Sequence, residues 1–485
     1  MSKAKKGNQS QQAGKGGNKG KKGGDDDDLE LLRDFEKKVE ISEKKAAAEA
    51  EARLAAEAEA AKKRKKETPI PAAQLKDVSQ EPCTARGLFK RGKTADEASA
   101  AVAALGEALA EEGKAPVKQT SPPTIPVAQL FKDKIFPAGE VIEMNSTTAR
   151  TTPGELRAQA NVIDDTILNE VREAAEVHRQ CRLDLQRFIK PGVSLLDIAE
   201  RLERSTKTLL GATGSLERGW GFPTGLSLNH CAAHYSPNPG DRTVVGENDV
   251  LKVDFGTHIN GRIIDCAFTV HFNPVYDNLV QAIQEATETG LRVAGVDMRL
   301  GDIGGAINEV MESYEVEIRG RTYPVKALRN LNGHDIKPYR IHGGKSVPLY
   351  NNHDQTKMEE NEFFAIETFG SIAGRGLVTE DMGEISHYMQ DFRHPGVCPS
   401  SVSAKAKSLF NTINARFGTL AFCRRWLEDE VGATYSLPLK QLVDAGVINP
   451  CPALNEIRGA YTAQFEHTIL IRDGSKEIIS RGFDY

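Results

Sequence analysis

Two aspartates lie at a spacing that would let them hold metal ions between two strands. Asp254 and Asp265 sit in two apolar runs that flank Asn260-Gly261. Asn-Gly between strand-like runs predicts a two-residue hairpin turn. In that register Asp254 lies opposite Ala267, and the two aspartates are diagonal neighbours on one face, about 7–8 Å apart at the backbone. This separation suits two cations about 3.5–4 Å apart that share a carboxylate.

Two glutamates recur in similar surroundings. Glu367 and Glu466 each lie within an apolar, strand-like run. A single strand acid ordinarily faces solvent, but four carboxylates in apolar runs are costly to bury unless protons or cations compensate them. His334, in a Gly/Asn-rich segment, would add a nitrogen ligand, although such a histidine is also common on a surface. Four carboxylates and one imidazole favour Mn²⁺, Fe²⁺ or Co²⁺, and Zn²⁺ is compatible.

The elements that must position these residues fall into two similar halves. The hydrophobic periodicity predicts a helix from about Pro153 to Ile189 and a second one from Ser194, which begins a capping motif with Asp197. Further helices over 277–289 and up to about Tyr314 precede strand-like runs at 362–370 and 461–471. We therefore predict a pseudo-symmetric α+β domain with its site between the halves. Residues 381–455 interrupt the second half as a mostly helical insertion.

The charge pattern divides the chain into an arm, a linker and a domain. The chain has 485 residues and a net charge of −5, yet residues 1–24 carry seven lysines and no acid, four aspartates follow, and residues 62–66 are all basic. We expect residues 1–66 to form a disordered arm with a charged helical part, 67–120 a linker, and 121–485 the catalytic domain. Three readings of the arm stay open: contacts with RNA phosphates, as on a ribosome; a nuclear-localisation signal; or a solubilising tail.

Cysteine usage and hydropathy bear on the compartment. The seven cysteines are odd in number and widely spaced, with no C-x-x-C pair, which fits a reducing environment. No run of about 18 apolar residues predicts a membrane span. The lysine-rich start lacks the apolar segment of a secretory signal. We expect a cytoplasmic protein, and a monomer.

Six segments resemble the type 2 methionine aminopeptidases of eukaryotes, and the likeness runs from about residue 120 to 485. The segments are Phe222-Pro-Thr-Gly225, Cys231-Ala-Ala-His-Tyr-Ser-Pro-Asn238, Lys252-Val-Asp-Phe-Gly-Thr-His258, Asn330-Leu-Asn-Gly-His334, Ala365-Ile-Glu-Thr-Phe369 and Gln464-Phe-Glu-His467. The resemblance implies the pita-bread fold. It also implies cotranslational removal of the initiator methionine from nascent polypeptides with a small second residue, with the arm contacting the ribosome or the translation initiation machinery.

The resemblance further assigns site residues. The family's ligands for two divalent metal ions match Asp254, Asp265, His334, Glu367 and Glu466. His234 matches the histidine at the scissile amide, and His342 the one that faces the substrate carbonyl. The wall of the methionine pocket matches Phe222, Ile341, His387 and Ala421. One position departs from the family, because Cys451 stands where a tyrosine is expected at the pocket rim.

These residues suggest a mechanism, and two alternatives remain. A water bridging two metals would be the nucleophile, with Glu367 as its proton acceptor, His342 at the oxyanion and His234 at the leaving nitrogen. A proline-directed peptidase of the same fold would share the five ligand types, but the segment from Cys231 to Asn238 and the helical insertion argue against it. A non-catalytic relative that binds RNA or ribosomes would have lost ligands, whereas all five are present here.

Overall fold

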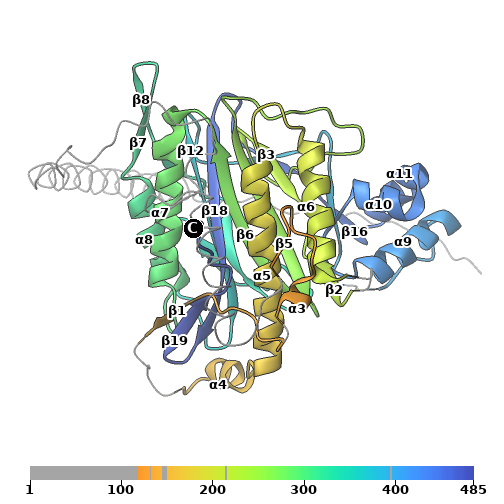
Figure 1. The fold of residues 1–485 in the computed structure, drawn as a ribbon, viewed down its shortest axis with the longest axis horizontal. Helices are drawn as coiled ribbons and strands as arrows, with labels where there is room; N and C mark the ends of the chain where they lie inside the picture. Colours follow the sequence, from red (N-terminus) through yellow and green to blue (C-terminus); the bar gives the residue numbers. More distant parts are fainter. Residues whose placement is uncertain (1–117, 132, 145–149, 213–215, 394–395) are drawn as a thin grey trace, which may run out of the picture. The chain divides into compact units, whose positions relative to one another are not determined.

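The computed structural model of the chain describes residues 118–131, 133–144, 150–212, 216–393 and 396–485 (Figure 1). Within them the helices are α3 (Val127–Leu130), α4 (Pro153–Ala160), α5 (Asp165–Phe188), α6 (Leu195–Leu210), α7 (Asp277–Val293), α8 (Leu300–Met311), α9 (Ala404–Arg416), α10 (Arg424–Val431) and α11 (Ser436–Asp444), with 3-10 turns η3 (Pro274–Tyr276) and η4 (Ala433–Tyr435). The predicted arm 1–66 and nearly all of the linker 67–120 lie outside the described residues.

The strands within the described residues form five sheets. They are β1 (Glu140–Glu143), β2 (Arg218–Trp220), β3 (Gly225–Leu228), β4 (Cys231–Ala233), β5 (Val250–Ile259), β6 (Arg262–His271), β7 (Glu315–Ile318), β8 (Arg321–Pro324), β9 (Lys326–Ala327), β10 (Asn332–Ile336), β11 (Ser346–Pro348), β12 (Phe363–Ile372), β13 (Thr379–Asp381), β14 (His387–Gln390), β15 (Phe422–Cys423), β16 (Ile448–Cys451), β17 (Ala453–Asn455), β18 (Tyr461–Arg472) and β19 (Ser475–Ile478). The largest sheet runs β1-β19-β18-β12-β10-β11 with β9 on β12, and another runs β2-β5-β3 with β6 on β5.

The hairpin predicted from Asn-Gly is confirmed. In the hairpin of β5 and β6, Asp254 lies opposite Ala267. The strand residues directly before and after the two-residue turn pair with each other. Asn260 and Gly261 have φ of 49° and 76°. Positive φ at both central positions matches the twist of the flanking strands, and asparagine and glycine adopt it at low cost. The turn therefore fixes which face of each strand carries an aspartate.

A second antiparallel pair repeats this arrangement. β12 and β18 pair along their length, with Glu367 directly opposite Glu466. Helix α5 packs on β5 and β6, and α7 packs on β12 and β18, so each pair has its own covering helix (Figure 1). The expected two-halved α+β architecture is thus confirmed.

Threonine hydroxyls join the two halves where β6 and β18 run side by side. Thr269 Oγ1 donates to the carbonyl of Gln464 at 2.7 Å and accepts from its N–H at 2.8 Å. Thr468 Oγ1 does the same with Asp265, at 2.7 and 2.8 Å. Each buried hydroxyl thus satisfies one backbone N–H and one C=O that would otherwise lack a partner. This junction holds Asp265 beside the strand that carries Glu466.

Alternation along the strands separates the acids from the helices. Phe255, next to Asp254, stacks on His178 of α5, with ring centroids 3.7 Å apart. Ile366, next to Glu367, reaches the backbone of α7 at Gly290. Because neighbouring strand residues point to opposite faces, the acids face away from the helix layer.

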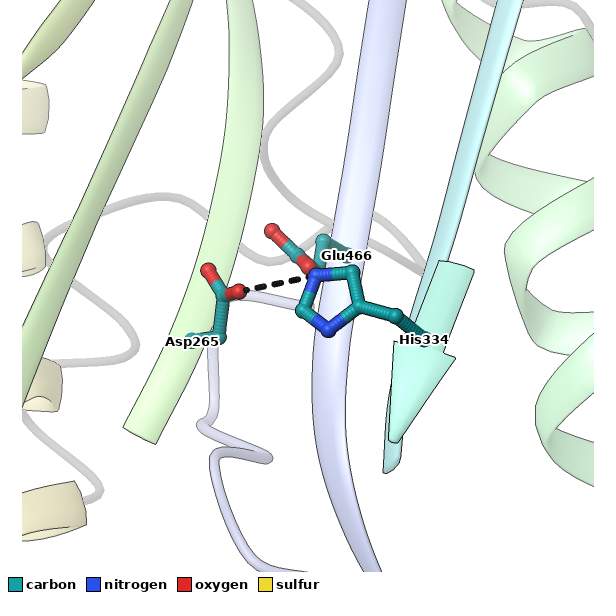
Figure 2. Close-up of side chains that lie close together, drawn as sticks. All are labelled: Asp265, His334 and Glu466. Atoms are coloured by element: carbon teal, nitrogen blue, oxygen red, sulfur yellow. Dashed lines mark ion pairs between the residues drawn. The ribbon is translucent and has the colours of Figure 1, made fainter. Parts of the chain in front are cut away.

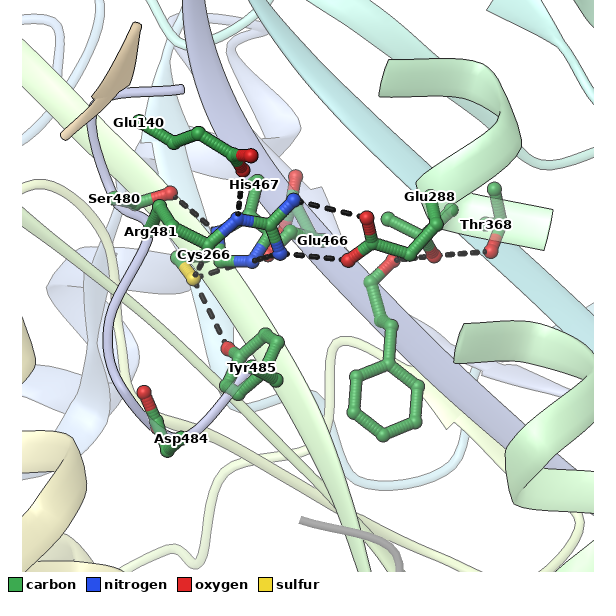
Figure 3. A network of polar contacts seen from close by, with 12 residues as sticks. Glu140, Cys266, Glu288, Thr368, Glu466, His467, Ser480, Arg481, Asp484 and Tyr485 are labelled. Atoms are coloured by element: carbon green, nitrogen blue, oxygen red, sulfur yellow. Dashed lines mark hydrogen bonds and ion pairs between the residues drawn. The ribbon is translucent and has the colours of Figure 1, made fainter. Parts of the chain in front are cut away.

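The helix-facing side of the junction is filled by a polar network (Figure 3). Cys266 Sγ lies 3.1 Å from the Tyr485 hydroxyl and donates to the Glu466 carbonyl at 3.0 Å. His467 Nδ1 lies 2.7 Å from Ser480 Oγ. Behind them, the buried Arg182 of α5 forms an ion pair with Asp484 at 2.5 Å. The strands carrying Asp265 and Glu466 are therefore fixed from behind.

Two expectations about the elements need correction. The single helix expected over 153–189 is two helices, α4 and α5. The break follows from capping, because the Asp164 carboxylate accepts the Ile167 N–H at 2.8 Å and begins α5 afresh. The predicted cap of α6 is present, with Ser194 accepting from the Asp197 N–H.

The second correction concerns residues 381–455. Besides α9, α10 and α11, they contain a three-stranded sheet in the order β15-β14-β16 and a hydrophobic cluster of their own. These strands are too short to show a period in the sequence. Residues 381–455 belong to the same compact unit as the rest of the described chain. Among the described residues, no helix is long and apolar enough to cross a membrane.

We predict that the threonine junction is a main contributor to stability. Thr468→Val keeps the shape of the side chain but leaves the buried N–H and C=O of Asp265 unpaired, so the free energy of unfolding should fall by about 1–3 kcal/mol. Urea unfolding monitored by circular dichroism measures it. Thr379→Val, at an exposed threonine with a 3.4 Å hydrogen bond, is the control and should change stability by less than about 0.5 kcal/mol. Equal losses in the two variants would show that the junction has no special role.

Candidate metal centre

The five residues predicted to bind metal come together on the face opposite the helices. Asp265, His334 and Glu466 each offer a ligand atom, and these atoms lie within 4.8 Å of one another (Figure 2). Asp254, Glu367 and Glu466 form a second group by the same criterion. Glu466 belongs to both groups, so its two carboxylate oxygens stand where a shared ligand would stand.

Five strands bring these residues together. The acids come one each from β5, β6, β12 and β18, and the imidazole from β10. His334 pairs through its backbone with Ala365 of β12. Its Nε2 lies 3.5 Å from Asp265 Oδ2, and its Nδ1 lies 3.4 Å from the carbonyl of Asp335. The ring is thereby turned with Nε2 toward the acids.

Burial dominates the electrostatics of the cluster. It raises the pKa of Asp254 to about 6. Burial, followed by the neighbouring carboxylates, raises the pKa values of Asp265, Glu367 and Glu466 well above their ordinary range. Burial lowers the pKa of His334 to about 3, so the imidazole is neutral and has a lone pair for coordination. Without cations, the cluster retains protons that unfolded carboxyls would release.

Unpaired oxygen atoms show that the cluster fits a cation. Within the described part of the chain, Asp254 Oδ1 and both carboxylate oxygens of Glu466 are buried without a hydrogen-bond partner. A buried acceptor with no donor is costly, and bound divalent cations would satisfy these three atoms. Four carboxylates with one neutral imidazole suit a hard or borderline ion such as Mn²⁺, Fe²⁺, Co²⁺ or Zn²⁺.

Gln464 orients two of the acids, a role not predicted from the sequence. Its Nε2 donates to Asp254 Oδ2 at 3.0 Å and to Glu367 Oε1 at 2.8 Å. It lies two residues before Glu466 and therefore on the same face of β18, so strand alternation was a usable signal. The amide bridges the two halves of the site at the level of their carboxylates.

The predicted substrate histidines lie around the cluster. His342 is exposed, and its ring meets that of His334 edge-on, with centroids 4.5 Å apart. His234 follows β4 with φ of 63°, an uncommon conformation for a residue with a side chain. Burial lowers its pKa to about 4, so it is neutral at pH 7. The ring of His387 in β14 lies 5.8 Å from that of His234.

Asp335, another residue whose role is not predicted from the sequence, shapes the loop that carries Ile341 and His342. Its buried carboxylate accepts the Lys345 N–H at 2.6 Å and pairs with Lys337 Nζ at 3.3 Å. Its carbonyl accepts the Gly343 N–H at 2.7 Å. Nothing in the sequence pattern distinguishes this acid from a surface residue. The loop closes around it, and His342 is thereby held against His334.

The predicted methionine-pocket residues come from separate segments. Phe222 lies against β5, where a side chain at Gly256 would approach its ring to 2.5 Å. Ile341 is half-buried in the loop around Asp335, while His387 and Ala421 are buried in or next to β14 and β15. His234 also lines a cavity of about 400 Å³, but none of the four predicted methionine-pocket residues lines it. It is lined by His234, Asn330, Leu331, Val378, Glu380, Pro450, Cys451, Pro452 and Leu454.

Comparison with known proteins identifies relatives. Residues 169–473 match the model of metallopeptidase family M24. Methionine aminopeptidase 2-2 of Aspergillus niger is 53% identical over 387 residues, covering 79% of this chain and 89% of that protein. Methionine aminopeptidase 2 of Podospora anserina is 55% identical over 376 residues, covering 76% and 83%. The solved structure of a thermophilic Arx1 has a TM-score of 0.55 at 18% identity, covering 65% of this chain and 91% of that one, which is a likeness of fold alone.

We predict that the metal-free cluster destabilises the fold at neutral pH. A carboxyl whose pKa is raised on folding binds protons more tightly in the folded state, so its contribution to the free energy of unfolding falls as pH rises. In EDTA at pH 7, Asp265→Asn should be more stable than the wild type by about 1 kcal/mol or more, and the difference should shrink toward pH 4.

Added Mn²⁺ should reverse that order. At a hundredfold excess over its Kd, the ion should stabilise the wild type by about 2.7 kcal/mol and the variant far less. Urea unfolding with and without Mn²⁺ tests both parts. Asp302→Asn, at an exposed aspartate of α8, is the control and should respond to Mn²⁺ like the wild type. A metal-free Asp265→Asn variant less stable than the wild type at pH 7 would contradict the prediction.

We further predict that Asp335 acts through His342. Asp335→Asn removes the charge that pairs with Lys337 and loosens the loop, so kcat should fall about tenfold while Co²⁺ affinity stays within a few-fold. The same change in a His342→Ala background should have almost no further effect on kcat, because the group it positions is absent. Steady-state kinetics and Co²⁺ titration of the four proteins test this. Additive losses would show that the two residues act independently.

Proposed function

This chain belongs to the type 2 methionine aminopeptidases of metallopeptidase family M24, and we propose that it removes the initiator methionine from nascent polypeptides whose second residue is small. Its fold is the pita-bread fold of that family, and it is a metal-dependent aminopeptidase. The observation that carries the proposal is the buried cluster of four carboxylates and one imidazole with three unpaired oxygen atoms.

Two cation sites that share Glu466 account for the cluster. Asp265 and His334 would complete one site, and Asp254 and Glu367 the other, because each group has its ligand atoms within 4.8 Å. Bound divalent cations supply the positive charge that lowers the pKa of a water molecule and polarises the scissile carbonyl.

Glu367 is the proposed proton acceptor. Gln464 donates to its Oε1, which leaves Oε2 to take the proton of the attacking water. The same amide restrains Asp254, so the carboxylate that moves the proton has a fixed neighbour.

Two histidines outside the ligand set act on the peptide bond. His234 is neutral at pH 7 because burial lowers its pKa, so its ring hydrogen-bonds the leaving nitrogen without placing a net charge there. His342 stands beside His334 at the open side of the site, where its N–H stabilises the oxyanion of the tetrahedral intermediate. Phe222, Ile341, His387 and Ala421 are proposed to surround the methionine side chain.

The proposal also covers the partner of the N-terminal arm and the cellular location of the enzyme. The lysine blocks of residues 1–66 support a contact with ribosomal RNA phosphates through counterion release, and such a contact would bring the enzyme to emerging N-termini in the cytoplasm. A proline-directed activity has less support, because the relatives with 53–55% identity are methionine aminopeptidases.

Methionine release from Met-Ala-Ser tests the proposal. Metal-free protein titrated with Mn²⁺, Co²⁺, Fe²⁺ or Zn²⁺ should regain activity, and Asp265→Asn should not. His234→Ala should lower kcat about a hundredfold while retaining the metals, as the loss of a hydrogen bond at the reacting centre predicts. Cleavage of an X-Pro peptide in place of Met-Ala-Ser would favour the proline-directed alternative. No release with any metal would overturn the proposal.

A further inference from the structure

The cavity lined by His234 has none of the five proposed metal ligands in its wall. Its volume of about 400 Å³ is within the range of ligand pockets. Most of its walls are apolar, formed by leucine, valine and proline side chains. Glu380 is the acidic residue among the lining residues. None of the four residues proposed to surround the methionine side chain lines this cavity, and Cys451, expected at the rim of that pocket, also lines it. The cavity therefore adjoins the methionine pocket and suits the part of the substrate beyond the scissile bond.

A row of paired residues runs from His234 to Glu380. β4, β17 and β13 form a three-stranded sheet in which Ala233, next to His234, pairs with Leu454, and Leu454 pairs with Glu380. Leu454 and Glu380 both line the cavity. The sheet is thus a wall that leads across three strands from the histidine at the leaving nitrogen to the carboxylate.

The strand spacing sets which substrate residue reaches Glu380. Two interstrand steps of about 4.8 Å place the β13 backbone roughly 10 Å from β4. An extended peptide advances about 3.3 Å per residue, so roughly 10 Å corresponds to three residues. With His234 at the nitrogen that leaves, Glu380 stands beside the third residue after the bond that is cut, the fourth of the substrate.

The side chain of Glu380 is exposed, and no ion pair joins it to a lysine or arginine among the described residues. The neighbouring acids are engaged elsewhere: Asp381 accepts from the Asn455 side chain at 3.0 Å, and Glu384 pairs with Arg424 at 3.4 Å. Burial and the charge of Glu380 raise the pKa of Cys451 to about 11, which keeps this wall thiol neutral. Glu380 is therefore the negative charge that a substrate meets in the cavity.

We propose that Glu380 is a specificity determinant that favours substrates with a lysine or arginine about three residues beyond the scissile bond. This selectivity rests on the proposed function, because it needs a peptide whose cleaved bond lies at His234. The group that Glu380 would bind is the positively charged side chain of that lysine or arginine in the substrate polypeptide. Leu331, Val378 and Leu454 would pack against the aliphatic part of that side chain while the carboxylate pairs with its charge.

The test is a comparison of kcat/KM for two pentapeptides, Met-Ala-Ser-Lys-Ser and Met-Ala-Ser-Glu-Ser, with C-terminal amides. Because Glu380 is exposed, we expect only a five- to tenfold preference for the lysine peptide at low ionic strength, weakening as salt is added. Glu380→Gln should bring the ratio to within about twofold of one, and Glu380→Lys should invert it. Moving the lysine to the third or fifth position maps the register.

Asp381→Asn provides the matched control. It removes the same charge one residue away, on the other face of β13, and should keep the preference of the wild type. Ratios within each variant cancel any change in overall activity, and cleavage of Met-Ala-Ser by the wild type tests the proposed function separately. Three results would each overturn the assignment of Glu380: equal kcat/KM for the two peptides in the wild type, an unchanged kcat/KM ratio in Glu380→Gln, or the same loss of preference in Asp381→Asn as in Glu380→Gln.

Discussion

The repulsion and desolvation of four carboxylates in one cluster, two of them buried and two half-buried, is the constraint on which the structure depends. Asp254, Asp265, Glu367 and Glu466 share one face of two strand pairs, and each has a raised pKa because burial penalises its charge. Only protons or cations can compensate such a cluster. A backbone that could relax would spread the carboxylates apart. The site therefore requires strands that cannot move independently.

The strands are held from behind and from the side. On the face toward the helices, Cys266 and His467 are neighbours of two of the acids, and they are hydrogen-bonded to Tyr485 and Ser480 (Figure 3). On the site face, both oxygens of Glu466 lack such partners. This contrast between two faces of the same strands explains the geometry, because the hydrogen bonds on the rear face keep the unsatisfied oxygens of the front face in place for a cation.

The sequence predicted what local chemistry determines. Asn260-Gly261 established the register of the first hairpin, and with it the shared face of its aspartates. That Glu367 lies directly opposite Glu466 could not be derived from spacing, because the two residues are 99 positions apart and the insertion lies between them. The role of Asp335 depends on a loop that closes around it, and the short strands of residues 381–455 have no readable period. These features depend on tertiary contacts between distant residues, and the periodicity of the sequence does not predict such contacts.

Rigid and adaptable parts of the site come from different kinds of structure. The four acids lie on long paired strands, where neighbouring hydrogen bonds keep each backbone atom in register, and metal coordination needs such precision. The residues proposed to contact substrate are placed otherwise: His234 follows a strand in a positive-φ conformation, His342 lies in a loop around Asp335, and Glu380 lies on a three-residue edge strand. A substitution in these segments leaves the strand register intact. Changes there can redirect which polypeptides are cut while the carboxylate cluster, and the chemistry that depends on it, is preserved.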